Sequence, residues 1–196
     1  MPRTNKASAS RRKGSRASAR GSKRSNGSSR DAIALLKKDH REVESLFSQF
    51  EKARQSDRKQ DIAMRICEAL RAHTTIEEEI FYPAFLAATD ETEIHHEAEI
   101  EHEGAKRLIA DIEGSSPDDD HYDARVTVLK EMIKHHVKEE EQPGGMFAKA
   151  RQSEMDLQAI GESLRSRKEQ VLGESASGAR RQSRRGRAAE IGVRMG

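Results

Sequence analysis

Hydrophobic residues recur at steps of three and four along four stretches of the chain, a spacing that is typical of amphipathic helices. These stretches cover residues 31–51, 58–88, 91–113 and 119–141, and a shorter amphipathic piece follows at residues 155–171. No run of alternating hydrophobic and polar residues indicates a strand. Long helices joined by short polar loops predict an all-α fold: an up-down-up-down four-helix bundle with a short extra C-terminal helix.

Signals at the ends of these stretches support the predicted helices. Asp31 is placed to cap the first helix, and Pro83 is expected to kink the second helix near its end. Gly114 followed by Pro117 predicts the end of the third helix, and Pro143 follows the fourth. Helix boundaries are therefore marked in the sequence itself.

The hydrophobic stripe of each long helix also carries polar residues. The expected core-facing positions are Ile33, Leu36, His40, Val43, Phe47 and Phe50; Ile62, Ile66, Leu70, His73, Glu77, Ile80 and Ala84; Ala98, His102, Ala105, Ile109 and Ile112; and Tyr122, Val126, Leu129, Ile133, His136 and Glu140. A weak internal repeat emerges, in which each half of the bundle has a histidine on one helix and a His-x-x-x-Glu pair on the next.

Burial makes these imidazoles and carboxylates costly unless they compensate one another or hold a cation. Residues four apart on a helix lie on the same face, so each His-x-x-x-Glu pair directs two ligand types to one place. Hydrogen bonds within the two His-x-x-x-Glu pairs explain the polar residues on two of the stripes, but they do not explain His40 and His102 on the other two. Nitrogen and oxygen ligands suit iron, manganese or zinc, and the single cysteine, Cys67, forms no thiolate site. Two glutamates able to bridge predict a dinuclear centre.

Four short stretches carry these residues: KDHR at 38–41, HTTIEEEIFYP at 73–83, EHE at 101–103 and HHVKEEE at 135–141. Together they resemble the HHE cation-binding domain of the hemerythrin family, and residues 157–169 resemble the helix that follows this domain in bacterial members. The resemblance implies two non-haem iron ions, with manganese or zinc less favoured. It implies terminal imidazole ligands at His40, His73, His102 and His136, and bridging carboxylates at Glu77 and Glu140.

The ligands on the fourth helix have an alternative, because His135 and Glu139 have the same spacing as His136 and Glu140. We prefer His136 and Glu140, since these two fall on the hydrophobic stripe of that helix. A second alternative concerns the ligands on the third helix.

Oxygen-carrying hemerythrins have a fifth histidine four residues from another on the third helix, but here those positions around His102 are Ala98 and Lys106. Either Glu99 or Glu103 supplies a further oxygen ligand, or one iron keeps an open position. An open, oxygen-rich iron favours reaction with peroxide, O2 or nitric oxide over reversible oxygen carriage.

Charge divides the chain into three parts, which the formal net charge of +2 conceals. Residues 1–30 contain ten Lys or Arg, eight Ser and no acidic residue, which predicts a disordered basic tail. Residues 31–172, acidic and rich in histidine, form the predicted hemerythrin-like domain. Residues 173–196 are rich in arginine and are predicted to be a second disordered tail.

Basic segments without aromatic residues are typical of nonspecific polyanion binding, so residues 1–30 and 174–196 are candidate nucleic-acid-binding segments. Balancing the acidic body is an equally good explanation. No apolar run is long enough to span a bilayer and no apolar segment follows the basic N-terminus, so we expect a cytoplasmic protein without a membrane partner.

The leading hypothesis is a di-iron protein that binds, senses or detoxifies O2, nitric oxide or peroxide. The alternatives are a peroxidase- or catalase-like enzyme and a nucleic-acid-associated iron-binding protein. Among the remaining residues, Cys67 is expected to pack in the core. His95, His96 and His121 are expected to face solvent, with a position beside the site as the alternative for His95, which lies two turns from His102. Tyr82 and Tyr122 are candidate hydrogen-bond donors to the site.

Overall fold

The computed structural model describes the backbone of residues 31–193 and the side chains of residues 31–178. The predicted disordered tail at residues 1–30 lies outside the described residues. Within the described range the chain is helical and contains no strand. The all-α fold predicted from the sequence is therefore confirmed.

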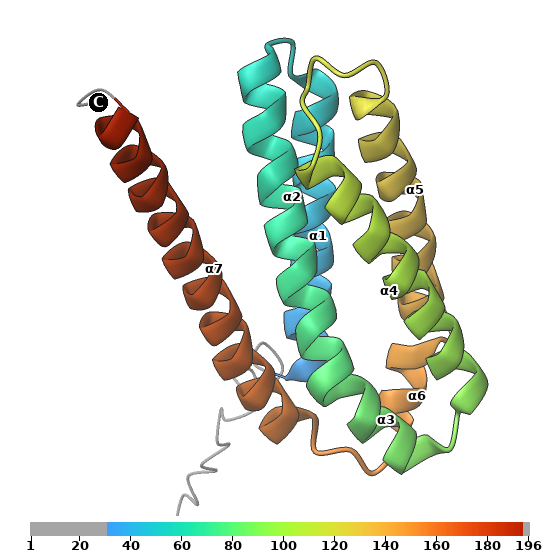
Figure 1. Ribbon diagram of the computed structural model, residues 1–196. Coiled ribbons are helices and arrows are strands. Elements are labelled where there is room, and N and C mark those ends of the chain that lie inside the picture. The colour runs from blue at the N-terminus through green and yellow to red at the C-terminus, as the bar shows by residue number, and fades with distance from the viewer. Residues whose placement is uncertain (1–30, 194–196) are drawn as a thin grey trace, which may run out of the picture.

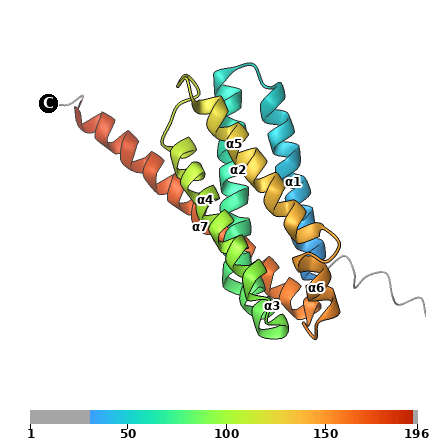
Figure 2. The same ribbon diagram turned by 90° about the vertical axis from the view of Figure 1, so that its right-hand side faces the viewer.

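Four long helices form an antiparallel bundle in which each helix runs opposite to the one before it (Figures 1 and 2). They are α1 (Ala32–Lys52), α2 (Ser56–Ile76), α4 (Thr92–Glu113) and α5 (Tyr122–Glu141). Around the bundle the order is α1, α2, α4, α5, and α5 returns to pack against α1. The up-down-up-down arrangement is the one that the hydrophobic stripes predict.

The bundle helices begin and end close to the capping and turn residues that the sequence indicated. The side chain of Asp31 accepts a hydrogen bond of 2.7 Å from the backbone N–H of Ala34. Gly114 follows the last residue of α4. After α5 the chain turns through Gly144, whose φ of 82° favours glycine, and Gly145, where a Cβ atom would collide with the carbonyl oxygen of Glu139. This turn leads directly into α6 (Met146–Gln152), a short helix that the sequence analysis did not predict.

The second predicted helix contains a wider, π-helical turn, η1 (Glu77–Phe81), before it continues as α3 (Tyr82–Thr89). The N–H of Tyr82 bonds to the carbonyl of Glu77, five residues back instead of four. Pro83 has no N–H, and in a regular helix its ring collides with the carbonyl four residues earlier. We attribute the wider turn to this proline, so the kink predicted there takes the form of a π-helix.

One extra residue in this turn rotates the rest of the helix relative to the core. Phe81, Tyr82 and Phe85 are buried, whereas Ile80 and Ala84, which the sequence pattern placed in the core, are only partly buried. A constant step of three and four residues does not account for a π-helical turn. The predicted stripe is therefore wrong beyond Glu77 and correct before it.

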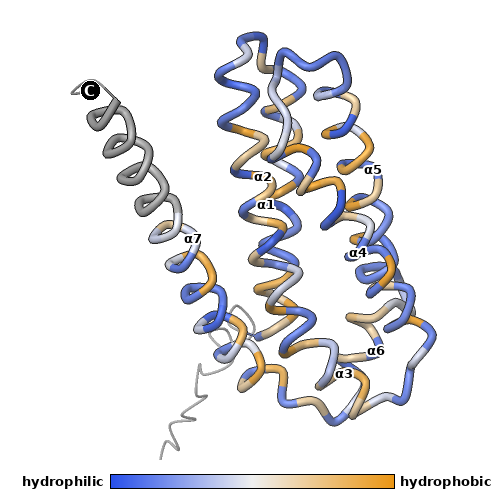
Figure 3. Tube along the Cα trace, in the orientation of Figure 1, coloured by the Kyte–Doolittle hydropathy of each residue, from blue (hydrophilic) through white to orange (hydrophobic). Residues whose placement is uncertain are grey.

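The interior consists of two hydrophobic clusters with polar residues between them. One cluster lies at the α1–α2 turn and contains Val43, Leu46, Phe47, Phe50, Ile62, Ile66, Leu70, Ile109, Ile112 and Tyr122 among others. The other lies at the end where α3 and α6 pack and contains Ile33, Leu36, Ile76, Phe81, Phe85, Met146 and Phe147 among others. Figure 3 shows hydrophobic and hydrophilic positions alternating along the bundle helices.

The last helix, α7 (Leu157–Val193), packs its first turns against α1 and α2 and then leans away from the bundle (Figure 1). Leu164 is fully buried in the second cluster. We expected a short helix that ends near residue 172 and a disordered tail from residue 173. In the structure the helix continues to Val193, and the alanine, arginine and glutamate residues of that segment are good helix formers. No helix in the described part of the chain has the length and apolar character to cross a membrane.

Candidate metal centre

Six buried polar side chains form one layer across the bundle, between the two hydrophobic clusters. They are His40, His73, Glu77, His102, His136 and Glu140, and each is at most 4% exposed. Every bundle helix contributes one histidine, and the two glutamates come from η1 and α5. The structure therefore brings together all six residues that the sequence analysis singled out.

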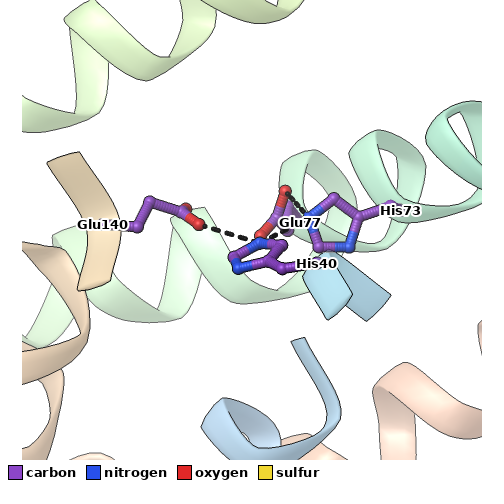
Figure 4. A group of neighbouring side chains, drawn as sticks. All are labelled: His40, His73, Glu77 and Glu140. Atoms are coloured by element: carbon purple, nitrogen blue, oxygen red, sulfur yellow. Dashed lines mark hydrogen bonds and ion pairs between the residues drawn. The ribbon is translucent and has the colours of Figure 1, made fainter. Parts of the chain in front are cut away.

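The first half of this layer gathers His40, His73, Glu77 and Glu140 (Figure 4). The Nε2 atom of His40 lies 3.1 Å from Nε2 of His73 and 3.3 Å from Oε2 of Glu140. Nε2 of His73 lies 3.2 Å from Oε2 of Glu77. One ligand atom from each residue falls within 4.8 Å of all the others, a spacing that can surround a single cation.

The second half consists of Glu77, His102 and His136. Nε2 of His102 lies 3.3 Å from Nε2 of His136 and 3.4 Å from Oε2 of Glu77. Glu140 reaches this half as well, because its Oε1 lies 3.7 Å from Nε2 of His136. Both glutamates thus face histidines of both halves, as carboxylates that bridge two cations must.

The Nδ1 atom of each site histidine faces a carboxylate from the adjacent helix. The pairs are His40 with Glu141 at 2.8 Å, His73 with Asp39 at 3.6 Å, His102 with Glu78 at 3.0 Å and His136 with Glu101 at 2.8 Å. A carboxylate at Nδ1 orients the imidazole ring and directs Nε2 toward a metal. The contacts run from α1 to α2, α4, α5 and back to α1, and so form a closed ring.

The sequence analysis did not identify these four carboxylates, although each is next in sequence to a predicted site residue. Three of these four carboxylates also form an ion pair with a lysine. Lys37 lies 3.1 Å from Glu141, Lys106 lies 2.6 Å from Glu78, and Lys168 of α7 lies 2.7 Å from Asp39. The helix after the bundle therefore supports the site through Lys168.

Charges within the layer compensate one another. Burial lowers the pKa of His40, but the facing carboxylates of Glu140 and Glu141 outweigh this effect and raise that pKa to about 9. Burial also lowers the pKa of His102, but the facing carboxylates of Glu77 and Glu78 outweigh it and raise that pKa to about 9. For Glu77, burial favours the neutral form, yet the surrounding histidines lower the pKa to about 2. Protonated imidazoles thus balance carboxylates here, and a bound cation would displace those protons.

Unpartnered oxygen atoms show that these charges do not complete the site. Neither oxygen of Glu77 has a hydrogen-bond partner among the described residues, and Oε2 of Glu140 has none. Both side chains are buried, and a buried carboxylate without a hydrogen bond is costly. The orphaned oxygens lie between imidazole nitrogens, so the residues present fit a pair of cations with nitrogen and oxygen ligands.

Tyr82 approaches the second half of the layer. Its hydroxyl group donates a hydrogen bond of 3.3 Å to Oε1 of Glu140 and lies 3.2 Å from Nε2 of His102. Burial, together with the nearby carboxylates, raises the pKa of Tyr82 well above its usual range, so the hydroxyl keeps its proton. Tyr122, the other tyrosine considered, lies in the first hydrophobic cluster against Phe50 and does not reach the site.

The alternative ligands considered from the sequence lie outside this layer. His135 has a side chain that is 62% exposed, and Glu139 accepts a hydrogen bond from Gln142. On α4, Glu99 is exposed and lies 3.5 Å from His95, and Glu103 pairs with Arg107 at the surface. Helix α4 therefore adds no oxygen ligand to the second half of the layer from either of these positions.

The sequence analysis predicted whether three further residues, Cys67, His95 and His96, are buried or exposed. Cys67 is fully buried, and burial raises its pKa to about 12, so it packs in the core as expected. His96 is exposed as expected. His95 takes the alternative position considered for it, since its side chain is only 13% exposed and its ring packs edge-to-face against Tyr82, which reaches the site.

Comparisons with known proteins agree with this geometry. The hemerythrin HHE cation binding domain family matches residues 31–143. A DNA nickase from Nostoc sp. is 30% identical over 153 residues, which cover 74% of this chain and 42% of that protein. The chain thus spans less than half the length of this relative.

A solved structure shares the fold. The crystal structure of a hemerythrin HHE cation binding domain-containing protein from Mycobacterium kansasii superposes with a TM-score of 0.65 at 22% identity, covering 76% of this chain and 92% of the other. The family match extends over more than half of the chain. The chain therefore belongs to the hemerythrin HHE cation-binding domain family, whose metal-binding helical bundle it has.

Proposed function

We propose that this protein holds two non-haem iron ions and uses them to bind, sense or detoxify O2, nitric oxide or peroxide. The single observation that carries this proposal is the position of Glu77. Its two buried oxygens have no hydrogen-bond partner among the described residues, and its Oε2 lies between the Nε2 atoms of His73 and His102. A carboxylate placed in this way fits a bridge between two cations.

The donor set favours iron over softer metals. Four imidazole nitrogens and carboxylate oxygens, without a thiolate, suit iron, with manganese and zinc as less favoured metals. In the proposed site His40 and His73 hold one ion and His102 and His136 hold the other, while Glu77 and Glu140 contact both. Bound iron would supply electron exchange with a small oxidant or diatomic ligand.

The lack of a further ligand from α4 in one half of the site supports binding of a small external ligand there. The half with His102 and His136 has no further described ligand at the positions of Glu99 or Glu103. The hydroxyl of Tyr82 stands beside this half and keeps its proton. This hydroxyl donates to Oε1 of Glu140, and on arrival of a ligand we propose that it turns from the glutamate to donate to that ligand.

Metal analysis and ligand titration test this proposal. Protein purified without oxidant is expected to contain two irons per chain, and its optical spectrum is expected to change on addition of peroxide or nitric oxide. Steady consumption of peroxide that is lost in Glu77→Gln would favour the enzymatic alternative. A folded protein that binds neither iron nor another divalent metal would refute the proposal.

A second proposed function concerns nucleic acid. Residues 1–30 contain ten basic residues, the C-terminal segment 174–196 contains six arginines, and the relative from Nostoc sp. is named a DNA nickase. We propose that these segments bind polyanions without sequence preference. Binding to duplex DNA that weakens steeply with salt and is lost on deletion of residues 1–30 would support this function. Equal DNA binding by the truncated chain would argue against it.

A further inference from the structure

Two pockets reach the buried layer from different sides of α5. One, of about 440 Å³, lies between α1 and α5 and reaches His40. The other, of about 520 Å³, lies between α4, α5 and the start of α6 and reaches His136 and Glu140. Each connects the surface of the bundle with different ligands of the same buried layer.

The two pockets carry opposite charge. The pocket between α1 and α5 is lined by Arg41, Lys130, Lys134 and Lys138, with Glu44 and Glu141 as its acidic residues. The pocket between α4 and α5 is lined by Glu97, Glu101, Glu139 and Glu140, and no lysine or arginine of residues 31–178 lines it. A charged cleft concentrates ions of opposite sign and speeds their arrival. A divalent cation is therefore attracted to the second pocket and repelled by the first.

Carboxylates follow the acidic pocket from its rim to its floor. Glu97 is exposed and forms no ion pair with the side chains that the structure describes. Glu101 has a side chain that is 25% exposed and binds His135 and His136. At the floor Glu140 is 2% exposed, and its Oε2 has no hydrogen-bond partner within the described part of the chain. A cation moving inward thus meets carboxylates of decreasing exposure and ends at an unpartnered oxygen.

From this arrangement we infer that the acidic pocket between α4 and α5 is the port through which a divalent cation reaches the buried site. The inference rests on the proposed dinuclear centre and adds its route of loading. Glu97 and Glu139 attract the cation at the outer part of the pocket, and Glu140 receives it at the floor. The basic pocket between α1 and α5 does not serve this purpose, because four cationic side chains line it.

Rates of metal loading test the port. Metal-free full-length protein is mixed with Co²⁺ at low ionic strength, and the appearance of the absorption of bound cobalt is followed in time. The double variant Glu97→Gln/Glu139→Gln is expected to load at least about threefold more slowly than the native chain, yet to reach the same two cobalt ions per chain. High salt should remove most of the difference, because it screens exposed charges.

Two matched controls separate the port from net charge. Glu42→Gln/Glu68→Gln removes two exposed carboxylates outside both pockets and is expected to load at the native rate. Lys134→Gln/Lys138→Gln alters the basic pocket and is not expected to slow loading. Equal slowing in the Glu42/Glu68 control, or native loading in the Glu97/Glu139 variant with two cobalt ions bound, would overturn the port alone. A native chain that binds no cobalt would overturn both the port and the proposed centre.

Discussion

Replacing Glu77 with glutamine removes one negative charge from the centre of the layer while preserving the shape of the side chain. The carboxylate is completely buried, and its Oε2 lies 3.2 Å from Nε2 of His73 and 3.4 Å from Nε2 of His102. Both halves of the proposed site therefore lose an anionic ligand in a single substitution. We expect the variant to fold but to bind metal poorly.

The effect on metal binding is expected to be large. Carboxylates that only orient a metal-bound histidine change affinity by about 10- to 100-fold. Glu77 faces both cation positions directly, so Glu77→Gln should lower the affinity for Co²⁺ or Fe²⁺ by more than about 100-fold, or more than about 2.8 kcal/mol.

The metal-free variant is also expected to lose stability. The pKa of His102 rises from 6.5 to about 9, although burial lowers it. This rise corresponds to about 3 kcal/mol of net stabilisation of the protonated ring by the facing carboxylates. Glu77 and Glu78 both face His102, at 3.4 Å and 3.0 Å, so the share of Glu77 is about 1–2 kcal/mol. Urea unfolding at pH 7 without metal measures this loss.

The assay combines metal content after dialysis with calorimetric titration of Co²⁺. Glu79→Gln is the matched control, because Glu79 lies two residues away, is exposed and pairs with Arg167 at the surface. The control is expected to retain two ions per chain. Glu77→Gln protein that binds two ions with native affinity would refute the bridging role of Glu77.

Further predictions concern the surroundings of the site and the first helix. Glu78→Gln leaves the proposed ligands in place but frees the His102 ring, so metal affinity should fall by about 10- to 100-fold in the same titration, and an unchanged affinity would speak against orientation by Glu78. Tyr82→Phe should retain two metal ions and bind nitric oxide more weakly, as followed by optical titration, and equal binding would exclude a hydrogen bond from the tyrosine. Because the pKa of His40 and His102 is raised to about 9, their protonation stabilises the metal-free fold fully below pH 6.5, and this contribution is lost as pH rises through 9. Urea unfolding of metal-free protein should then give a lower free energy of unfolding at pH 9 than at pH 6.5, and no decrease would contradict these pKa values. Asp31→Ala removes the N-cap of α1 and should cost about 1 kcal/mol in urea unfolding, whereas a cost near zero would show that the cap contributes little.

Periodicity was enough to predict the bundle and the layer of ligands. A buried histidine such as His102 lies on the same stripe as Ala98 and Ala105, so its direction follows from helix geometry alone. The choice of His136 over His135 followed from the same reasoning, and the structure buries the first and exposes the second.

Features that depend on contacts between helices were not predictable in this way. The carboxylates at Nδ1 are adjacent in sequence to one site residue but serve the histidine of another helix, as Asp39 serves His73. Sequence spacing within one helix carries no information about such a pairing. The π-helical turn and the burial of His95 against Tyr82 depend in the same way on local hydrogen bonding and packing.

The C-terminal boundary was missed for a different reason. The helix formers after Gly173 continue α7, although few hydrophobic residues remain there to indicate an amphipathic stripe. Composition suggested a tail, and the four glycines of residues 173–193 offset the helix propensity of the alanines and arginines, so the sequence carried no clear signal for the continuation. Lys168, which contacts Asp39, shows that the beginning of this helix belongs to the site.

The central claim is that two metal ions lie in the buried layer and share Glu77 and Glu140. A crystal of the iron-loaded protein, measured on both sides of the iron absorption edge, tests this claim most directly. Two anomalous peaks are predicted, one beside Nε2 of His40 and His73 and the other beside Nε2 of His102 and His136. A single peak, or two peaks elsewhere on the molecule, would contradict the account.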